Sequence, residues 1–475
     1  MSFNSFVFLC IFLPGMVIGY FLLPKKMKNF YLLIGSILFY IWGDDKGLPV
    51  LFFSILFNYI FGLAIYGLRK KEGENGRGAK WIVFLAVLFN LGLLGVYKYT
   101  SFILHNFQKL FHTSFNPVEI ILPLGISFFT FQGISYVIDV YREEGRQGRS
   151  IVQKNLFDFA LYIGMFPQLT AGPIIRYHTV REALSNREHT IGKLALGFER
   201  FIIGLSKKVI LSGTVGEVAS KIMESDYTIM GSSLAWLGAV CYTFEIYYDF
   251  SGYSDMAIGL GKMFGFDFEE NFHYPYISCS ITEFWRRWHI SLSSWFKDYL
   301  YIPLGGNRKG NVYRNLAIVF LATGIWHGAA WGFVIWGMWH GAFMLAERWF
   351  RNMKWHIPVV VKWFYTMLVV TFGWVLFRIV DLRQTWHYFK IMFHVSRPEF
   401  VGFSVWYYLD AKMICILVIC FLSMIPWKQW WKNIDQWEER RGILWIKRIF
   451  LLTLLLISMM FLMNGTYSPA IYAQF

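Results

Sequence analysis

The sequence predicts an all-α integral membrane protein with about 10–12 transmembrane or re-entrant helices. Of its 475 residues, 56% are hydrophobic and only 16% are charged, whereas soluble domains carry about 25% charged residues. The mean hydropathy is +0.43. Apolar runs of about 20 residues, the length that crosses a bilayer, recur along most of the chain. A soluble globular fold is therefore excluded.

The apolar runs define the expected membrane segments. Pro167 interrupts one of them, because a proline removes a backbone donor from a helix. Another, the run 316–338, fits either one span or a pair of shorter helices. In chain order, the segments are Ser2–Leu23, Phe30–Gly43, Leu48–Leu68, Trp81–Tyr97, Ile120–Val140, Leu156–Ile175, Leu194–Leu211, Ile229–Tyr248, Leu316–Met338, Val359–Ile379, Lys412–Ile425 and Leu444–Met463.

Basic residues orient these segments. The first run reads as a retained helix and not as a secretory signal, because the lysines of 25–28 follow it instead of preceding it. The loops Arg69–Lys80 and Tyr141–Ser150 also carry excess Lys and Arg, and such loops stay cytoplasmic. We expect a multi-pass protein of the plasma membrane whose N-terminus lies outside.

The net charge of +15 fits cytoplasmic loops that meet anionic lipid headgroups, and we expect no nucleic-acid partner. The basic loops also suit an anionic cytosolic cofactor. Five cysteines are scattered without a CxxC spacing, so neither a disulfide framework nor a metal site is predicted. With no long linker and no clear repeat, residues 1–475 are expected to form one membrane domain, with a catalytic core at about 118–345.

Polar residues crowd into the apolar sequence between positions 244 and 341. At membrane depth such residues face a protein-lined cavity, so this region predicts broken, cavity-lining helices. Asp249 and Asp255 are candidates for metal ligands or transport carboxylates, but we favour helix capping or pairing with Arg286, Arg287 or Arg314. The aromatic and basic run 285–301 is typical of an interfacial amphipathic helix.

Three Trp-His pairs are the strongest candidates for chemistry: Trp288-His289, Trp326-His327 and Trp339-His340. His327 lies in an otherwise uncharged stretch whose small neighbours leave room for a substrate. Desolvation favours neutral imidazole, which accepts a proton from a hydroxyl and passes it to a leaving group. That chemistry suits acyl transfer. His273 is an intermediate candidate, and the loop histidines have no such case: His105, His112, His178, His189, His356, His387 and His394.

Long ordered runs of this chain resemble the membrane-bound O-acyltransferase (MBOAT) superfamily, and within it the alginate-type bacterial polysaccharide O-acetyltransferases. The resemblance lies in the runs Pro123–Arg142, Met165–Tyr177, Tyr247–Phe266, Asn271–Gly310 and Gly324–Gly341. It implies a ring of tilted helices around a central channel that joins a cytosolic donor site to an outer acceptor site.

The resemblance also implies roles for particular residues. His327 matches the family's catalytic histidine, and His289 matches its second polar residue. His340 fits the family pattern but is expected to give structural support. Residues in the matched runs are expected to contact substrates: Trp326, Trp288, Tyr248, Asp249, Ser251 and Arg286.

The reaction that this resemblance implies is transfer of an acetyl group from cytosolic acetyl-CoA across the membrane to an extracytoplasmic polysaccharide. No permanently bound cofactor is expected, and a separate partner with an SGNH-hydrolase-like fold would esterify the polymer. Whether His327 is a general base or a transient acyl carrier stays open. Two alternatives are D-alanyl transfer from a carrier protein to teichoic acid and proton-coupled transport. Transporters often show inverted repeats, and no clear repeat is found in this sequence.

Overall fold

The computed structural model describes residues 2–73, 76–113, 120–143, 151–308, 310–350, 356–394, 402, 404–427 and 441–464. The described residues form helices and connecting loops and contain no strand, so the all-α prediction is confirmed. The chain divides into two compact units, residues 1–198 with 257–269, and residues 199–256 with 270–474. Parts of the two basic loops, 74–75 and 144–150, lie outside the described residues.

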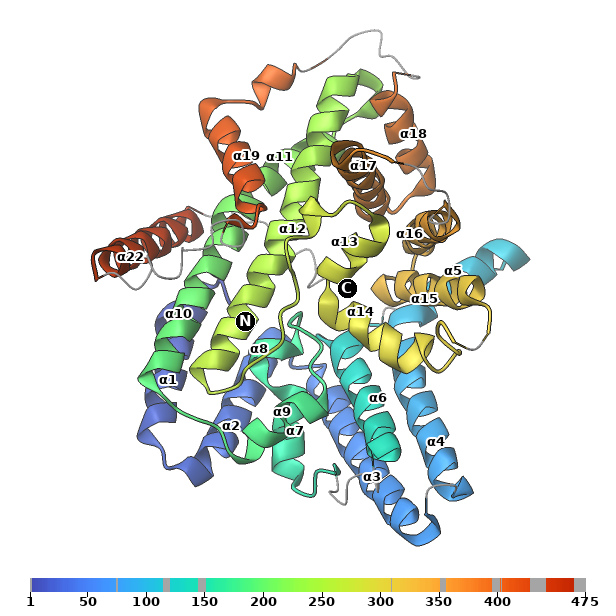
Figure 1. Ribbon diagram of the computed structural model, residues 1–475, viewed down its shortest axis with the longest axis vertical. Coiled ribbons are helices and arrows are strands. Elements are labelled where there is room, and N and C mark those ends of the chain that lie inside the picture. The colour runs from blue at the N-terminus through green and yellow to red at the C-terminus, as the bar shows by residue number, and fades with distance from the viewer. Residues whose placement is uncertain are drawn as a thin grey trace. The chain divides into compact units, whose positions relative to one another are not determined.

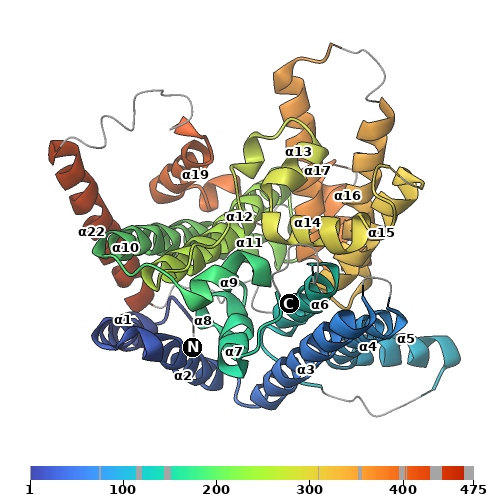
Figure 2. The ribbon, with the colours of Figure 1, turned by 60° about the horizontal axis from the view of Figure 1, so that its bottom comes forward.

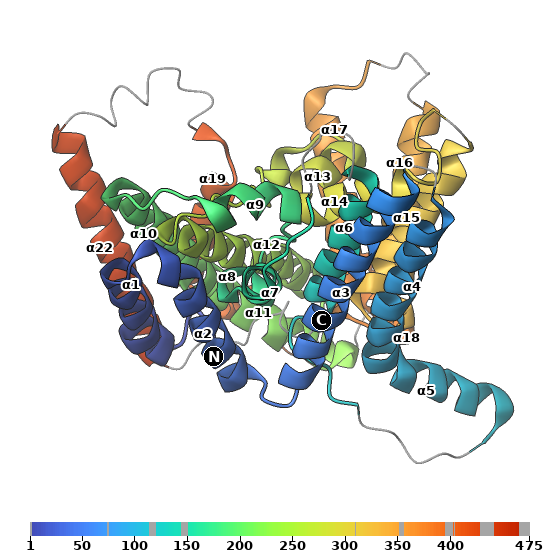
Figure 3. The same cartoon turned by 90° about the horizontal axis from the view of Figure 1, so that it is seen from below.

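The first unit is built from the N-terminal helices. Helices α3, α4 and α6 pack on one another, as Figure 3 shows. Its elements are η1 (Phe8–Phe12), α1 (Leu13–Leu22), α2 (Lys25–Gly43), α3 (Leu48–Glu72), α4 (Arg77–Leu94), η2 (Gly95–Tyr99), α5 (Thr100–Phe111), α6 (Ile126–Glu143), α7 (Leu156–Gly164), α8 (Phe166–Leu169) and α9 (Tyr177–Ser185).

The second unit holds the polar region that the sequence singled out, except for residues 257–269. Helices α10 (Ile191–Ser206) and α12 (Ser232–Met263), the long helix in Figure 1, contribute to both units. The other elements are η3 (Lys207–Ser212), α11 (Gly213–Met223), η4 (Tyr227–Ile229), η5 (Pro275–Ile277), α13 (Ile281–Arg287), α14 (Ile290–Phe296), η6 (Lys297–Tyr301), α15 (Val312–His327), α16 (Trp331–Phe350), α17 (Val359–Arg378), α18 (Leu382–Met392), η7 (Val405–Tyr407), α19 (Ala411–Ser423) and α22 (Arg441–Met463).

Four stretches of described helix are long and apolar enough to cross a membrane: Leu48–Glu72, Arg77–Phe111, Val359–Arg378 and Gly442–Met463. Two shorter apolar helices span Phe8–Leu22 and Ala411–Ser423. The other expected segments are too short or too polar to meet the same standard. Long and short apolar helices together agree with a protein that has both transmembrane and re-entrant segments. The number of helices that cross the membrane stays a prediction.

Two boundaries differ from the sequence prediction. The run 156–175 is broken into α7 and α8 at Met165, whose backbone is extended, because Pro167 fits only in the first turn of a helix. The expected segment Ile229–Tyr248 ends before a glycine-rich run, yet α12 continues through this run to Met263. Its glycines serve packing instead: a Cβ on Gly252 would lie 2.7 Å from the carbonyl oxygen of Gly204 on α10.

Helices α15 and α16 form a tight antiparallel pair, so the run 316–338 is two helices (Figure 2). Glycines allow the close approach. A Cβ on Gly324 would lie 2.5 Å from the carbonyl oxygen of Phe333, and one on Gly337 would collide with that of Phe320. Backbone cannot yield as a flexible side chain can, so small residues are required at this crossing.

Gly324→Ala should therefore destabilise the protein by about 1–3 kcal/mol, because α15 must move away from α16. Gly92→Ala is the matched control, since a Cβ at this α4 position meets no described heavy atom within 4 Å. The control should be neutral or more stable by up to about 1 kcal/mol. Thermal unfolding of both variants in detergent checks this, and equal stabilities would show that the crossing is not tight.

Candidate active site

His327 is the last residue of α15, and a three-residue turn separates it from α16. Asn311 begins α15 by accepting hydrogen bonds from the backbone N–H groups of Tyr313 and Arg314. Gly328 ends it in an extended conformation, and a side chain there would collide with the Phe333 ring. The His327 side chain is 2% exposed. The imidazole thus lies at the C-terminal, negative end of the α15 dipole.

His289 lies at the break between α13 and α14 in a left-handed conformation, φ 44° and ψ 56°. Such a conformation is costly for a residue other than glycine, and it persists only when its surroundings fix it. Asn271 does so. Its backbone oxygen accepts from Ile290 N at 2.9 Å, and its side-chain oxygen accepts from Ser291 N at 3.1 Å. The same oxygen lies 3.2 Å from His289 Nδ1, so the imidazole is held in one orientation.

A carboxylate joins the segment of His289 to the helix that follows His327. Glu347 of α16 accepts from Ile281 N at 2.5 Å and from Thr282 N at 3.0 Å, at the start of α13. A negative charge is favourable at a helix N-terminus. Ser280 also caps α13 by accepting from Glu283 N. Charge-assisted hydrogen bonds from the backbone of α13 to Glu347 therefore hold α13, which precedes His289, against α16, which follows His327.

An aromatic cluster connects the three histidines. The Trp326 ring lies 6.3 Å from His289 and 5.0 Å from His327. The Trp336 ring lies 4.8 Å from His327 and 5.2 Å from His340. All three imidazoles are 2% exposed or less, so they share one water-poor environment.

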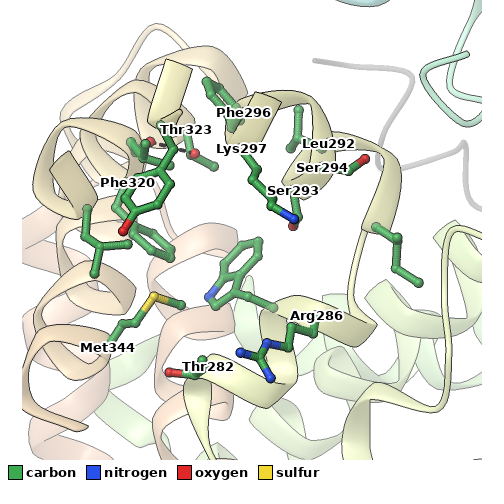
Figure 4. A pocket seen from close by; sticks show the side chains of 15 residues that line it. Thr282, Arg286, Leu292, Ser293, Ser294, Phe296, Lys297, Phe320, Thr323 and Met344 are labelled. Atoms are coloured by element: carbon green, nitrogen blue, oxygen red, sulfur yellow. Dashed lines mark hydrogen bonds between the residues drawn. The ribbon is translucent and has the colours of Figure 1, made fainter. Parts of the chain in front are cut away.

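A cavity of about 350 Å³ opens beside this cluster. Its walls come from α13, α14, η6, α15 and α16 and are mostly apolar. Figure 4 shows Arg286 at the lower edge of the cavity and Lys297 on the side formed by Ser293 and Phe296, and both residues are exposed. Neither side chain pairs with a carboxylate among the described residues, so the cavity combines an apolar interior with two available cations.

The cavity follows the helix face that carries His327. Its α15 wall is Leu316, Val319, Phe320 and Thr323. His327 follows Thr323 by one helical turn on the same face, because residues four apart are neighbours on a helix. On the opposite wall, Ile290 and Leu292 belong to α14, which begins directly after His289. A bound molecule would thus extend toward both histidines.

Three of the other expected substrate residues lie near this site. Arg286 lines the cavity, and Trp326 lies between His289 and His327. Trp288, 1% exposed, stacks on Phe284 at 5.5 Å. The predicted interfacial helix 285–301 is instead broken into α13, α14 and η6, which brings His289 inward.

The remaining expected residues lie on α12. Tyr248 donates to the backbone oxygen of Cys420 on α19, and buried Asp249 forms an ion pair with Lys208 of η3. Asp255 pairs with Arg200 and Lys207, at 2.7 Å each. These partners replace the arginines that we expected at 286, 287 and 314. Ser251 is buried, and its hydroxyl has no hydrogen-bond partner in the described part of the chain.

Two of the loop histidines, His178 and His189, have structural partners. A hydrogen bond with Asp139 raises the pKa of His178, and the two side chains lie 3.1 Å apart. Burial lowers the pKa of His189 to about 4, with the charge of Lys28 adding to the effect. His189 Nδ1 lies 3.1 Å from the Tyr20 hydroxyl. Both histidines are far from the cavity residues in the sequence, and none of their recorded contacts is with a cavity residue.

Sequence reasoning missed Glu347, Trp336 and the clamping role of Asn271. Asn271 opens the run NFHYPY, which the family resemblance contains, so a signal existed for it. Glu347 lies in the run LAERWF, which shows no motif, and its role emerges only when α16 packs on α13. The described residues contain no cluster of His, Cys, Asp and Glu that could bind a metal ion.

The geometry is that of a buried imidazole one helical turn beyond a mostly apolar cavity that Arg286 and Lys297 also line. The model of the membrane-bound O-acyltransferase family matches residues 107–381, more than half of the chain and all of the elements that form the site. The chain belongs to the membrane-bound O-acyltransferase family. It is therefore a membrane acyltransferase.

Relatives within this family act on polysaccharides, as their names state. A probable alginate O-acetylase, AlgI, of Pseudomonas putida is 39% identical over the full length of both chains. AlgI of Pseudomonas aeruginosa is 43% identical over 89% of this chain and 82% of its own. A peptidoglycan O-acetyltransferase of Helicobacter pylori is 34% identical over 100% of this chain and 97% of its own.

Proposed function

We propose that this chain moves an acetyl group from cytosolic acetyl-CoA across the plasma membrane for O-acetylation of an extracytoplasmic polysaccharide. The observation that carries the proposal is the buried His327 at the end of α15, one helical turn beyond an apolar cavity whose two cations, Arg286 and Lys297, form no ion pair within the described part of the chain. The names of the relatives support an acetyl donor and a polysaccharide acceptor.

The cavity suits the donor. Acetyl-CoA carries phosphates at one end and a thioester at the end of a slender pantetheine arm. Arg286 and Lys297 would bind the phosphates, since charge-assisted hydrogen bonds to phosphate are strong. The arm would follow the α15 face from Leu316 toward Thr323. This arrangement would bring the thioester to His327.

His327 would act as general base or as transient acyl carrier. As base it accepts the proton of the acceptor hydroxyl while the hydroxyl oxygen attacks the thioester carbon. The C–S bond then breaks, and the thiolate takes the proton from the imidazolium. As carrier its nitrogen attacks first and the acceptor removes the acetyl group in a second step. His289, held by Asn271, would orient the acceptor or stabilise developing charge.

The acceptor proposed is an alginate-like exopolysaccharide, peptidoglycan or cellulose. The names of the relatives include alginate and peptidoglycan O-acetylation, which favours these polymers. An extracytoplasmic partner with an SGNH-hydrolase-like fold would take the acetyl group and complete the ester. The chain's own part is then the membrane step, from thioester to outer acceptor.

A donor competition in purified membranes tests this proposal. Membranes with the protein receive radiolabelled acetyl-CoA or a D-alanylated carrier protein, and label entering the acceptor fraction is measured. We expect transfer from acetyl-CoA alone. Transfer from the aminoacylated carrier alone would replace the proposal with D-alanylation, and proton-coupled uptake into proteoliposomes without any acyl transfer would replace it with transport.

A further inference from the structure

Trp336 is a buried hydrogen-bond donor whose donor atom has no partner. The side chain is 1% exposed, and its Nε1 has no acceptor among the described residues. Neighbouring tryptophans differ: Trp339 Nε1 donates to the Val369 oxygen at 2.9 Å, and Trp374 Nε1 to the Tyr276 hydroxyl at 3.1 Å. Because an unsatisfied buried donor costs free energy, its retention calls for an acceptor that arrives with a ligand.

The contacts of Trp336 indicate where such an acceptor would bind. Its ring lies 4.8 Å from the His327 ring, at 86° to it. It also lies 5.7 Å from Trp285, a residue of the cavity wall. Trp336 thus contacts both the His327 imidazole and a residue of the cavity wall. Trp285 and His340 also have unpaired buried nitrogens, but the described structure records no ring contact of either with His327.

Acyl transfer needs a donor at this place. When a nucleophile attacks the thioester carbon, the C=O π pair moves onto the carbonyl oxygen, which becomes an oxyanion. Collapse re-forms the C=O bond, breaks the C–S bond and releases the thiolate, which takes the proton from the imidazolium. Donors that face the oxyanion in a dry site stabilise the transition state more than the ground state.

We propose that the Trp336 indole N–H donates a hydrogen bond to the thioester carbonyl oxygen as negative charge develops on it. Trp336 is then a catalytic residue beside His327. This inference rests on the proposed function, because it requires a thioester donor in the cavity.

The test replaces only the N–H. At position 336, β-(3-benzothienyl)alanine keeps the two-ring shape and substitutes sulfur for the N–H group. CoA release from acetyl-CoA is followed with the purified full-length protein in the presence of alginate, whose hydroxyl groups accept the acetyl group. Loss of one oxyanion donor should lower kcat by about 10²–10³-fold, while KM for acetyl-CoA stays within about 3-fold because the ground-state contacts remain. Trp336→Phe should lower kcat at least as much.

The same replacement at Trp339 is the matched control, since it lies one turn away on α16 and its N–H is already bonded to Val369. Its kcat should stay near the wild-type value. An unchanged kcat at position 336, a change in KM alone, or an equal loss in both variants would overturn the inference. If the wild-type protein releases no CoA, the proposed function fails and the inference fails with it.

Discussion

His327→Ala should lower acetyl transfer by about 10²–10⁴-fold or more, since that is what removal of a positioned base costs. Alanine removes the only part of the side chain that can accept a proton or carry an acyl group. The α15 end should persist, because it depends on Gly328 and the α16 packing and not on the imidazole. CoA release and thermal unfolding, measured on the same purified sample, check the two halves of this expectation.

His105→Ala is the control for this variant. His105 is exposed on α5, and α5 contributes no residue to the cavity. Its activity should equal that of the wild-type protein. Near-normal CoA release by the His327 variant would remove His327 from the mechanism, whereas loss of folded protein in that variant alone would mean that the imidazole is structural.

Asp249→Ala should destabilise the protein by about 3–5 kcal/mol, the usual cost of removing one partner from a buried ion pair. Asp249 and Lys208 are 4% and 1% exposed, and their side chains are in direct contact. Without the carboxylate, the Lys208 ammonium loses its closest negative charge in a dry environment. Denaturant titration in detergent, with the folded fraction followed by tryptophan fluorescence, measures the loss.

A double variant separates charge from packing. Replacing both partners by apolar residues, Lys208→Met with Asp249→Leu, removes the uncompensated charge and should recover much of the stability. If Asp249→Ala is as stable as the wild type, the pair is not buried in the working protein. If the double variant is no better than the single one, the loss arises from packing.

The sequence predicted those parts of the fold that depend on local signals. The apolar runs at 48–68 and 359–379 correspond closely to α3 and α17, because a continuous apolar helix needs no tertiary information to be recognised. Pro167 marked the break between α7 and α8. The end of the expected segment at Tyr248 was wrong, because the glycines that follow do not end α12 and Gly252 lets it pack closely on α10.

Local sequence signals also predicted part of the candidate site. His289 and His327 stand out in the sequence because histidine in an apolar setting is rare and because both lie in long runs that resemble the family; their roles stay predictions. The ion pair of Asp249 with Lys208 depends on the packing of α12 on η3. No residue spacing in either segment predicts that packing. Trp336 is one of 21 tryptophans in the chain, and no sequence motif marks it; the lack of an acceptor for its buried N–H among the described residues, and its contact with His327, are visible only in the structure.

The most direct test of the account is mass spectrometry of cell-surface polysaccharides from three matched cell lines, which express the wild-type chain, the His327→Ala variant or neither. We predict O-acetyl groups on a surface polymer with the wild-type chain, and their loss both with the variant and without the protein. Equal O-acetyl content in all three lines would contradict the proposed function, and normal O-acetylation by the variant alone would contradict the role of His327.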